Sequence, residues 1–252
     1  MKSIKRRRRV RLVPLWHKAL SQRKLEAIVN GDGFNDVLDD LVAFTGLTLA
    51  QVMERVKRTP LNHYQSEFRW HSPRDFRELS WYYRVTYGYL FGNTAHPYWS
   101  KLDFLDPSVG PVLDYGGGVG NNVITLAERG FDVHYTEISL IQESFLRFRA
   151  ARRGLDIEII EPYADGAFDP VGCIDDPFGA IILQDVLEHV PDYQILLGHL
   201  IAQVKPGGYI IENSPFNELA PNIDIHLSAT VPLESAMRGM TPVADGIWQR
   251  IE

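Results

Sequence analysis

The chain has 252 residues, of which 45% are hydrophobic and 23% are charged, and this composition is typical of a globular protein that buries a substantial core. Its single cysteine, Cys173, excludes an internal disulfide framework and a cysteine-based zinc site, and fits a reducing, cytoplasmic location. No apolar run approaches the roughly 18 residues that a membrane-spanning helix needs, so we expect no membrane span.

The net charge of −6 is unevenly distributed along the chain. Residues 1–60 carry 13 Lys and Arg against 6 Asp and Glu, whereas residues 61–252 carry 13 against 26. Most of the N-terminal excess comes from Lys5–Arg9 and Arg11. This basic stretch is either an arm that contacts nucleic acid or another polyanion, or a solvated tail. The acidic remainder argues against a broad phosphate-binding face.

Residues 1–104 are predicted to form a helical N-terminal cap or lid region that carries the basic tail. Caps, prolines and glycine stops predict helices at Leu15–Asn30, Asn35–Phe44, Leu49–Lys57 with Thr48 as N-cap, and Ser72–Tyr89. Between residues 64 and 104 lie 13 of the chain's 28 aromatic residues. Such a density serves helix packing and also suits the wall of a small-molecule pocket.

After residue 105, predicted strands alternate with predicted helices. The strands are Pro111–Tyr115, Asp132–Thr136, Asp156–Ile160, Phe178–Leu183, Tyr209–Glu212 and Gly246–Ile251, and the helices are Asn121–Arg129, Leu140–Arg153, Tyr193–Val204 and Pro232–Arg238. This alternation predicts an α/β fold with a doubly wound, mostly parallel sheet over residues 105–252. Only one strand can be placed after Tyr209–Glu212.

A glycine-rich loop follows the first of these strands. Its pattern is D-x-G-x-G-x-G, with Asp114, Gly116, Gly118 and Gly120 at the defined positions. Ligands of doubly wound sheets bind beyond the carboxyl ends of the strands, and glycines let the backbone approach a ligand closely. The helix after the loop directs its free N–H groups at the same place. The dinucleotide pattern G-x-G-x-x-G does not fit from Gly116 or from Gly118.

The loop resembles the first motif of class I S-adenosylmethionine-dependent methyltransferases. Three further landmarks follow in the family's order: Glu137, which is 23 residues after Asp114, the segment Gln184–Pro191, and Val204–Gly208. The resemblance covers residues 109–252. It implies a Rossmann-like methyltransferase fold in which residues 105–252 bind S-adenosylmethionine.

The resemblance also implies which side chains contact the cofactor. Glu137 would bind both ribose hydroxyls, because two carboxylate oxygens match two neighbouring hydroxyl donors. Asp165 would contact adenine. The implied cofactor-binding set is Asp114, Gly116, Gly118, Gly120, Glu137, Asp165 and Gln184.

The candidate catalytic residues follow the strand Phe178–Leu183. Asp185, Glu188 and His189 are spaced i, i+3 and i+4, and they would share one face if Asp185 begins a helix. In the family, a later histidine, here His226, faces the same cleft.

Two mechanisms are compatible with this set. Some relatives, the ubiquinone-pathway and small-RNA 2′-O-methyltransferases, bind a divalent cation through E-x-x-E-H and the later histidine. This chain has D-x-x-E-H, so Asp185, Glu188, His189 and His226 form a candidate metal site. In the alternative, His189 or His226 accepts the acceptor's proton without a metal, and Asp185 caps a helix or contacts the cofactor.

Three functions remain open at this point. The favoured one is methyl transfer from S-adenosylmethionine to a small-molecule acceptor, with oxygen slightly preferred as the acceptor atom. The second is metal-dependent 2′-O-methylation of RNA, which would use the basic arm. The third is a non-methylating cofactor-binding or scaffold module on the same fold.

Overall fold

The computed structural model describes residues 34–58, 90, 98–164, 167–168, 177–190, 192–216, 229 and 231–251. The predicted helices Leu15–Asn30 and Ser72–Tyr89 lie outside these residues, as do Asp165 and His226. Within the described part, no helix is both long and apolar enough to cross a membrane.

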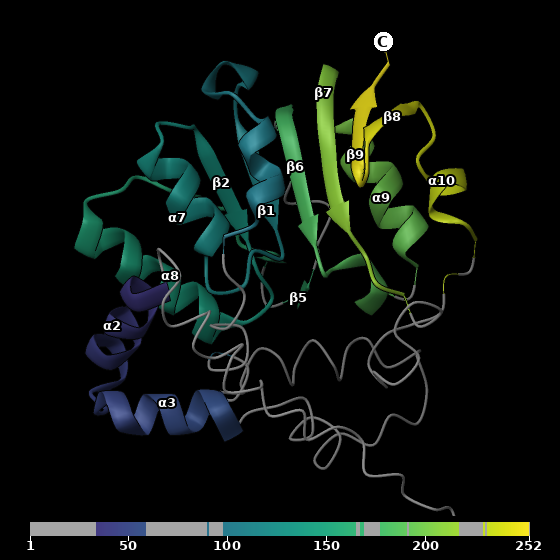
Figure 1. Cartoon of the computed structure of the whole chain (residues 1–252). Coiled ribbons are helices and arrows are strands. Elements are labelled where there is room, and N and C mark those ends of the chain that lie inside the picture. The colour runs from purple at the N-terminus through teal and green to yellow at the C-terminus, as the bar shows by residue number, and fades with distance from the viewer. Residues whose placement is uncertain are drawn as a thin grey trace, which may run out of the picture.

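A seven-stranded sheet forms the centre of the molecule (Figure 1). Its order is β3-β2-β1-β6-β7-β9-β8, and every pair from β3 to β7 is parallel, whereas β9 runs antiparallel to β7 and β8. The strands are β1 (Val112–Tyr115), β2 (Val133–Thr136), β3 (Glu158–Ile159), β6 (Phe178–Gln184), β7 (Val204–Asn213), β8 (Met240–Ala244) and β9 (Ile247–Arg250). This topology confirms the predicted doubly wound, mostly parallel sheet.

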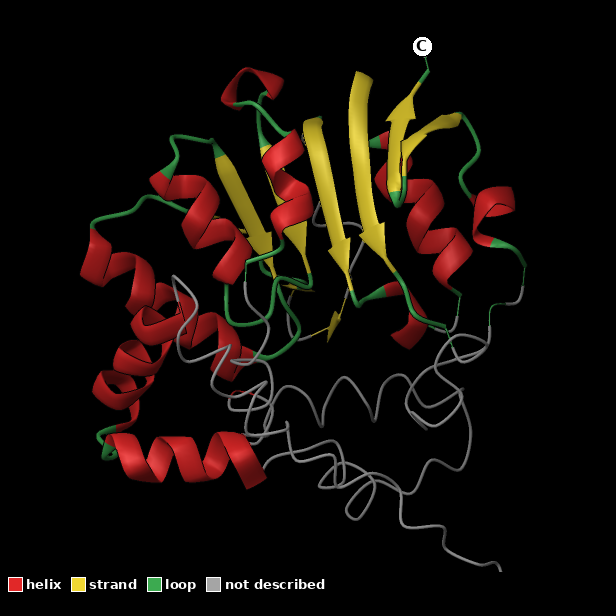
Figure 2. Ribbon diagram, in the orientation of Figure 1, coloured by secondary structure: helices red, strands yellow, loops and turns green. Residues whose placement is uncertain are grey.

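Helices flank this sheet, as Figure 2 shows. The α-helices are α2 (Phe34–Thr45), α3 (Leu49–Arg58), α7 (Asn121–Glu128), α8 (Leu140–Arg153), α9 (Tyr193–Ala202) and α10 (Leu233–Ala236), and the 3-10 turns are η1 (Ser100–Phe104), η2 (Pro107–Val109) and η3 (Leu187–His189). Thr48 caps α3 as predicted: its hydroxyl accepts from the Gln51 N–H, while the Gln51 side chain accepts from the Thr48 N–H.

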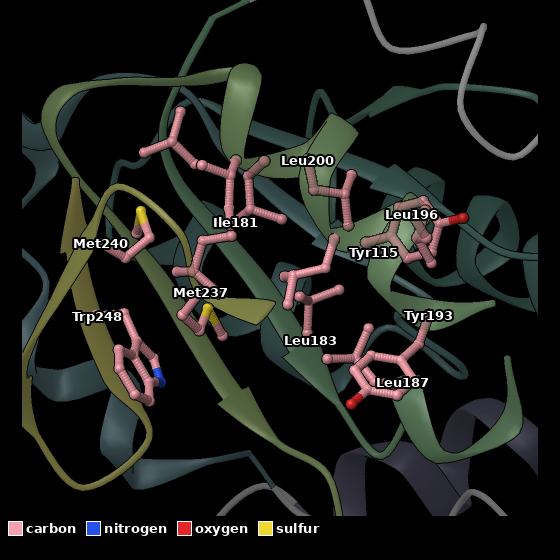
Figure 3. Close-up of a cluster of buried hydrophobic side chains, with 14 of the residues drawn as sticks. Tyr115, Ile181, Leu183, Leu187, Tyr193, Leu196, Leu200, Met237, Met240 and Trp248 are labelled. Carbon is pink, nitrogen blue, oxygen red and sulfur yellow. The ribbon is translucent and has the colours of Figure 1, made fainter. Parts of the chain in front are cut away.

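The alternation of side chains along β1 divides the core between the two faces of the sheet. Leu113 and Tyr115 pack with α9 and α10 in one cluster, which Figure 3 shows in close-up. Val112, which points the other way, packs with Val123 of α7 and Leu146 of α8. Both faces of β1 are thereby buried, and this fixes the position of the glycine loop that leaves its carboxyl end.

The strand predicted at Tyr209–Glu212 is longer than expected. β7 begins at Val204, so the predicted helix Tyr193–Val204 ends earlier, at Ala202. The pairing with β6 shifts between Phe178, opposite Val204, and Ala180, opposite Tyr209. The Pro-Gly-Gly segment between them forms this irregularity. Because these residues favour turns, the sequence predicted a turn where the chain continues as a strand.

Only one strand could be placed from the sequence after β7, whereas the hairpin β8–β9 supplies two. β8 contains Pro242, and of its five residues only Met240 is buried. An edge strand tolerates proline and lacks the apolar alternation by which strands are recognised. The short hairpin of β4 (Tyr163–Ala164) and β5 (Ala167–Phe168) was not predicted either.

Candidate functional site

The candidate site lies where the strand order reverses, at the carboxyl ends of β1 and β6. Both strands are parallel and adjacent, and they continue to opposite sides of the sheet. Such a switch point separates the two following loops and leaves a crevice for a ligand. The loop 116–120 leaves β1 here, and Gln184 ends β6 at the same edge.

The glycine loop requires glycine at both of its ends. Gly116 has a φ of +73°, and a Cβ there would come within 2.8 Å of Val186 Cγ2. Gly120 has a φ of +79° and is the N-cap of α7, and a Cβ there would overlap Leu146. Positive φ and missing space both exclude larger side chains. The loop therefore packs against the segment after β6 on one side and against α8 on the other.

Glu137 follows β2 and is hydrogen-bonded to the glycine loop. Its Oε2 accepts from the N–H of Gly118 at 2.9 Å, and its Oε1 accepts from the N–H of Ser139 at 2.9 Å. The backbone N–H of Ile138 also bonds this carboxylate. Because a carboxylate has about four acceptor sites, a ribose hydroxyl can still donate to it. Burial raises the pKa of the carboxyl group to about 7.

Asp114 is the second buried carboxyl group of the site. Burial, followed by the nearby charge of Glu137, raises its pKa to about 7, while a hydrogen bond from Asn122 lowers it. Its Oδ2 has no hydrogen-bond partner among the described residues. A buried acceptor of this kind beside a glycine-lined turn fits a ligand that brings hydrogen-bond donors or positive charge, as S-adenosylmethionine does.

Asn122 connects three parts of the site, and the sequence analysis missed it. Its Nδ2 donates to Gln184 Oε1 at 3.0 Å, and its Oδ1 accepts from the N–H of Trp99 at 3.0 Å. Together with its hydrogen bond to Asp114, these contacts join β1, β6 and the segment before η1. The two consecutive asparagines, Asn121 and Asn122, in the first turn of α7 were the available indication.

Asp185, Glu188 and His189 do not share a helical face, because Asp185 does not begin a helix. Asp185 has a φ of +54°, the only positive φ of a non-glycine residue in the described part. Two contacts with Asn213 hold it there: its N–H donates to the Asn213 carbonyl, and its Oδ1 accepts from Asn213 Nδ2, both at 2.8 Å. A conformation of this kind persists only when its surroundings enforce it.

Glu188 and His189 lie in η3 with different environments. Glu188 is 0% exposed, whereas the His189 side chain is 19% exposed, and His189 Nε2 lies 3.9 Å from Glu188 Oε1. Burial, with the negative charges of Asp185 and Glu212, raises the pKa of Glu188 to about 8. At neutral pH this carboxyl group is therefore largely protonated.

The candidate metal set does not assemble within the described residues. No group of three or more His, Cys, Asp or Glu side chains among them is arranged to hold a metal ion. The fourth predicted ligand, His226, and the predicted adenine contact, Asp165, lie outside the residues that the structure describes.

A topological switch point with a glycine loop after β1 and an acid after β2 is typical of α/β proteins that bind a nucleoside-containing ligand. The chain belongs to the methyltransferase-domain family, whose model matches residues 92–238, more than half of its length. This confirms the resemblance to class I S-adenosylmethionine-dependent methyltransferases, and the protein is accordingly an enzyme.

Similar proteins act on different acceptors, according to their names. A ubiquinone biosynthesis O-methyltransferase of Chromobacterium violaceum is 30% identical over 171 residues, which are 57% of this chain and 67% of the relative. A tRNA 5-carboxymethoxyuridine methyltransferase of Escherichia coli K12 is 30% identical over 116 residues, 44% of each chain. A glycine/sarcosine/dimethylglycine N-methyltransferase of Actinopolyspora halophila is 28% identical over 126 residues, 47% of this chain and 22% of the relative. The chain thus spans less than half of the last two.

Proposed function

We propose that the protein transfers the methyl group of S-adenosylmethionine to a hydroxyl group of a small-molecule acceptor. The observation that carries this proposal is the pairing of the glycine loop with Glu137 at the switch point. The O-methyltransferase of C. violaceum, of which the chain covers 67%, supports oxygen as the acceptor atom.

In this proposal, Glu137 and the loop hold the adenosyl part of the cofactor. The Glu137 carboxylate accepts from the ribose, while the backbone N–H groups of Gly118 and Ser139 keep it oriented. Asp114 and Gln184, which Asn122 links, line the same edge of the sheet. Bound S-adenosylmethionine supplies an electrophilic methyl carbon, so the remaining tasks of the protein are alignment and proton removal.

His189 is the proposed general base. An imidazole is the side chain that most often removes a proton at neutral pH. His189 follows β6 in η3 and is partly exposed, whereas Glu188 beside it is buried. The acceptor oxygen forms its bond to the methyl carbon as the carbon–sulfur bond breaks, and the hydroxyl proton passes to His189. Asp185, fixed by Asn213, shapes the turn that presents η3. His226 is an alternative base.

Residues 1–104 are proposed to cap this site. Val37, Leu38 and Leu41 of α2 form an apolar cluster with Val119 of the glycine loop and Phe145 of α8. α2 therefore packs against the cofactor loop. In this proposal the aromatic residues that follow it in the sequence cover the acceptor.

The test is turnover of a panel of small phenols, aliphatic alcohols and amines with S-adenosylmethionine. Turnover is measured by the release of S-adenosylhomocysteine and by the mass of the methylated product. We expect methylation of hydroxyl compounds. His189→Ala should lower kcat by a factor of about 10² to 10⁴ and leave the Kd for S-adenosylhomocysteine within about twofold. His199→Ala, on the exposed side of α9, is the control. Exclusive methylation of amines contradicts the proposal.

RNA is the second candidate acceptor, supported by the tRNA methyltransferase relative and by the basic stretch Lys5–Arg9. If RNA is the acceptor, deletion of residues 5–9 will lower the turnover of RNA and will leave S-adenosylhomocysteine binding unchanged. A metal-dependent 2′-O-methyltransferase would in addition lose activity with a chelator. Turnover of small phenols alone, unaffected by the deletion, excludes this candidate.

A further inference from the structure

A buried arginine on α8 holds the end of the glycine loop. Nη1 of Arg149 donates to the carbonyl of Val119 at 2.5 Å and to Asn121 Oδ1 at 2.8 Å. The peptide between Val119 and Gly120 is also fixed on its other side, because the Gly120 N–H donates to the Gly117 carbonyl at 2.9 Å. A planar peptide bonded through both its C=O and its N–H cannot rotate without losing one of the two.

Arg149 is itself held by an acid from the N-terminal segment. Its Nε lies 3.1 Å from Asp40 Oδ2, and both side chains are only 3% exposed. A buried guanidinium is stable only when it is paired and hydrogen-bonded. Burial lowers the pKa of Arg149 to about 10, and the charge of Asp40 opposes this shift. Arg149 is therefore cationic at neutral pH.

Asp40 also binds two further arginines of α8. Its Oδ1 lies 3.2 Å from Arg152 Nη1, and its Oδ2 lies 2.8 Å from Arg153 Nη2. Arg149 donates to the glycine loop. Among the described residues, neither Arg152 nor Arg153 has a hydrogen bond to this loop. Loss of Arg149 would thus leave Asp40 paired, so the contribution of Arg149 to the loop can be separated from its contribution to the docking of α2.

Apolar side chains around Arg149 also connect α2, α8 and the glycine loop. The guanidinium of Arg149 lies 5.5 Å from the ring centroid of Phe145, and Phe145 shares a cluster with Val119 and with Leu41 of α2. α2, α8 and the loop therefore form one packed unit, in which a charged pair lies among apolar side chains.

We propose that Arg149, oriented by Asp40, is a positioning residue for the cofactor loop, so that the docking of α2 sets the affinity for S-adenosylmethionine. The inference rests on the proposed cofactor site. Because coupling between two binding events is reciprocal, cofactor binding will in turn stabilise the docked position of α2.

The experiment compares Arg149→Met with Arg152→Met in the full chain. Both remove one arginine from Asp40, but only the first removes the donor to Val119. We expect Arg149→Met to raise the Kd for S-adenosylhomocysteine, measured by calorimetry, and the KM for S-adenosylmethionine by about tenfold. The kcat at saturating S-adenosylmethionine should stay within about twofold of wild type. Arg152→Met should leave Kd and KM unchanged.

Two conservative variants add a second test in case Arg149→Met does not fold. Arg149→Lys keeps the charge but cannot reach Asp40 and Val119 in the same fork geometry, and we expect an intermediate Kd. Asp40→Asn should raise the Kd in the same direction, because it loosens the guanidinium.

Several results would overturn the inference. An Arg149→Met protein with the Kd of Arg152→Met and an equal fall in Tm would show that Arg149 serves stability alone. A Kd of wild-type value in both Arg149→Lys and Asp40→Asn would show the same. If the wild-type protein binds no S-adenosylhomocysteine, the proposed cofactor site itself is wrong. If the wild-type protein binds it and Arg149→Met binds it equally well, only the role of Arg149 is wrong.

Discussion

The carboxylate of Glu137 accepts a hydrogen bond of 2.9 Å from the N–H of Gly118, so the acid after β2 and the loop after β1 form one unit. This contact fixes both partners of the proposed cofactor site. An acid that is already oriented loses little conformational freedom when a ligand binds.

Replacement of Glu137 by alanine should abolish cofactor binding. The change removes the acceptor for the ribose hydroxyls and frees the Gly118 N–H inside the site. We expect the Kd for S-adenosylhomocysteine to rise by about a hundredfold or more, which corresponds to about 2.8 kcal/mol. Glu234→Gln, on the exposed helix α10, should bind like wild type. Unchanged calorimetric binding by Glu137→Ala would place the cofactor elsewhere.

Cofactor binding should weaken as the pH falls below 7. The pKa of Glu137 is raised to about 7 in the ligand-free protein, and its carboxylate form accepts best from hydroxyl donors. At lower pH the proton must leave before binding, so the Kd should be about tenfold higher at pH 6 than at pH 8. Calorimetry in two buffers of different ionisation enthalpy should show proton release at pH 6.5. A pH-independent Kd with no proton release would contradict this prediction.

The ligand-free protein should lose stability as the pH rises. Glu188 has a pKa of about 8, above its ordinary value of 4.5, so between these values the folded protein holds a proton that the unfolded chain has released. The free energy of unfolding then falls as pH rises through this window. Urea unfolding at pH 5 to 8 should show the fall, and Glu188→Gln should reduce it by an amount on the order of a few kcal/mol. Parallel curves for both proteins would refute the assignment.

The backbone conformation of Asp185 can be tested by three substitutions. Asn tolerates a positive φ and keeps an oxygen for the Asn213 amide, so Asp185→Asn should remain near wild-type stability. Asp185→Gly and Asp185→Ala both lose the side-chain hydrogen bond, but only alanine opposes the positive φ. Alanine should therefore be less stable than glycine by about 1 kcal/mol, measured by urea unfolding. The reverse order would show that Asp185 has an ordinary φ in solution.

The sequence was sufficient for the parts of the site that depend on local pattern. The loop 116–120, Glu137 and Gln184 follow strands whose apolar runs are easily recognised, and parallel strands bring their carboxyl ends to one edge. Prediction failed at Asp185, because an i, i+3, i+4 spacing indicates a helix only where the backbone can begin one. The contact with Asn213, 28 positions later, enforces another conformation.

The sequence by itself determined the alternating sheet, the family and the methyl donor, because these depend on periodicity and on residues close together in the chain. Only the tertiary structure decided what holds the loop in place. Asp40 and Arg149 are 109 positions apart, and Trp99 and Asn122 are 23 apart. No periodic pattern marks such pairs, because their energy arises when folding buries polar groups that must then find partners. The Glu137–Gly118 contact combines both contributions: sequence placed the two residues at the ends of adjacent strands, and folding joined them.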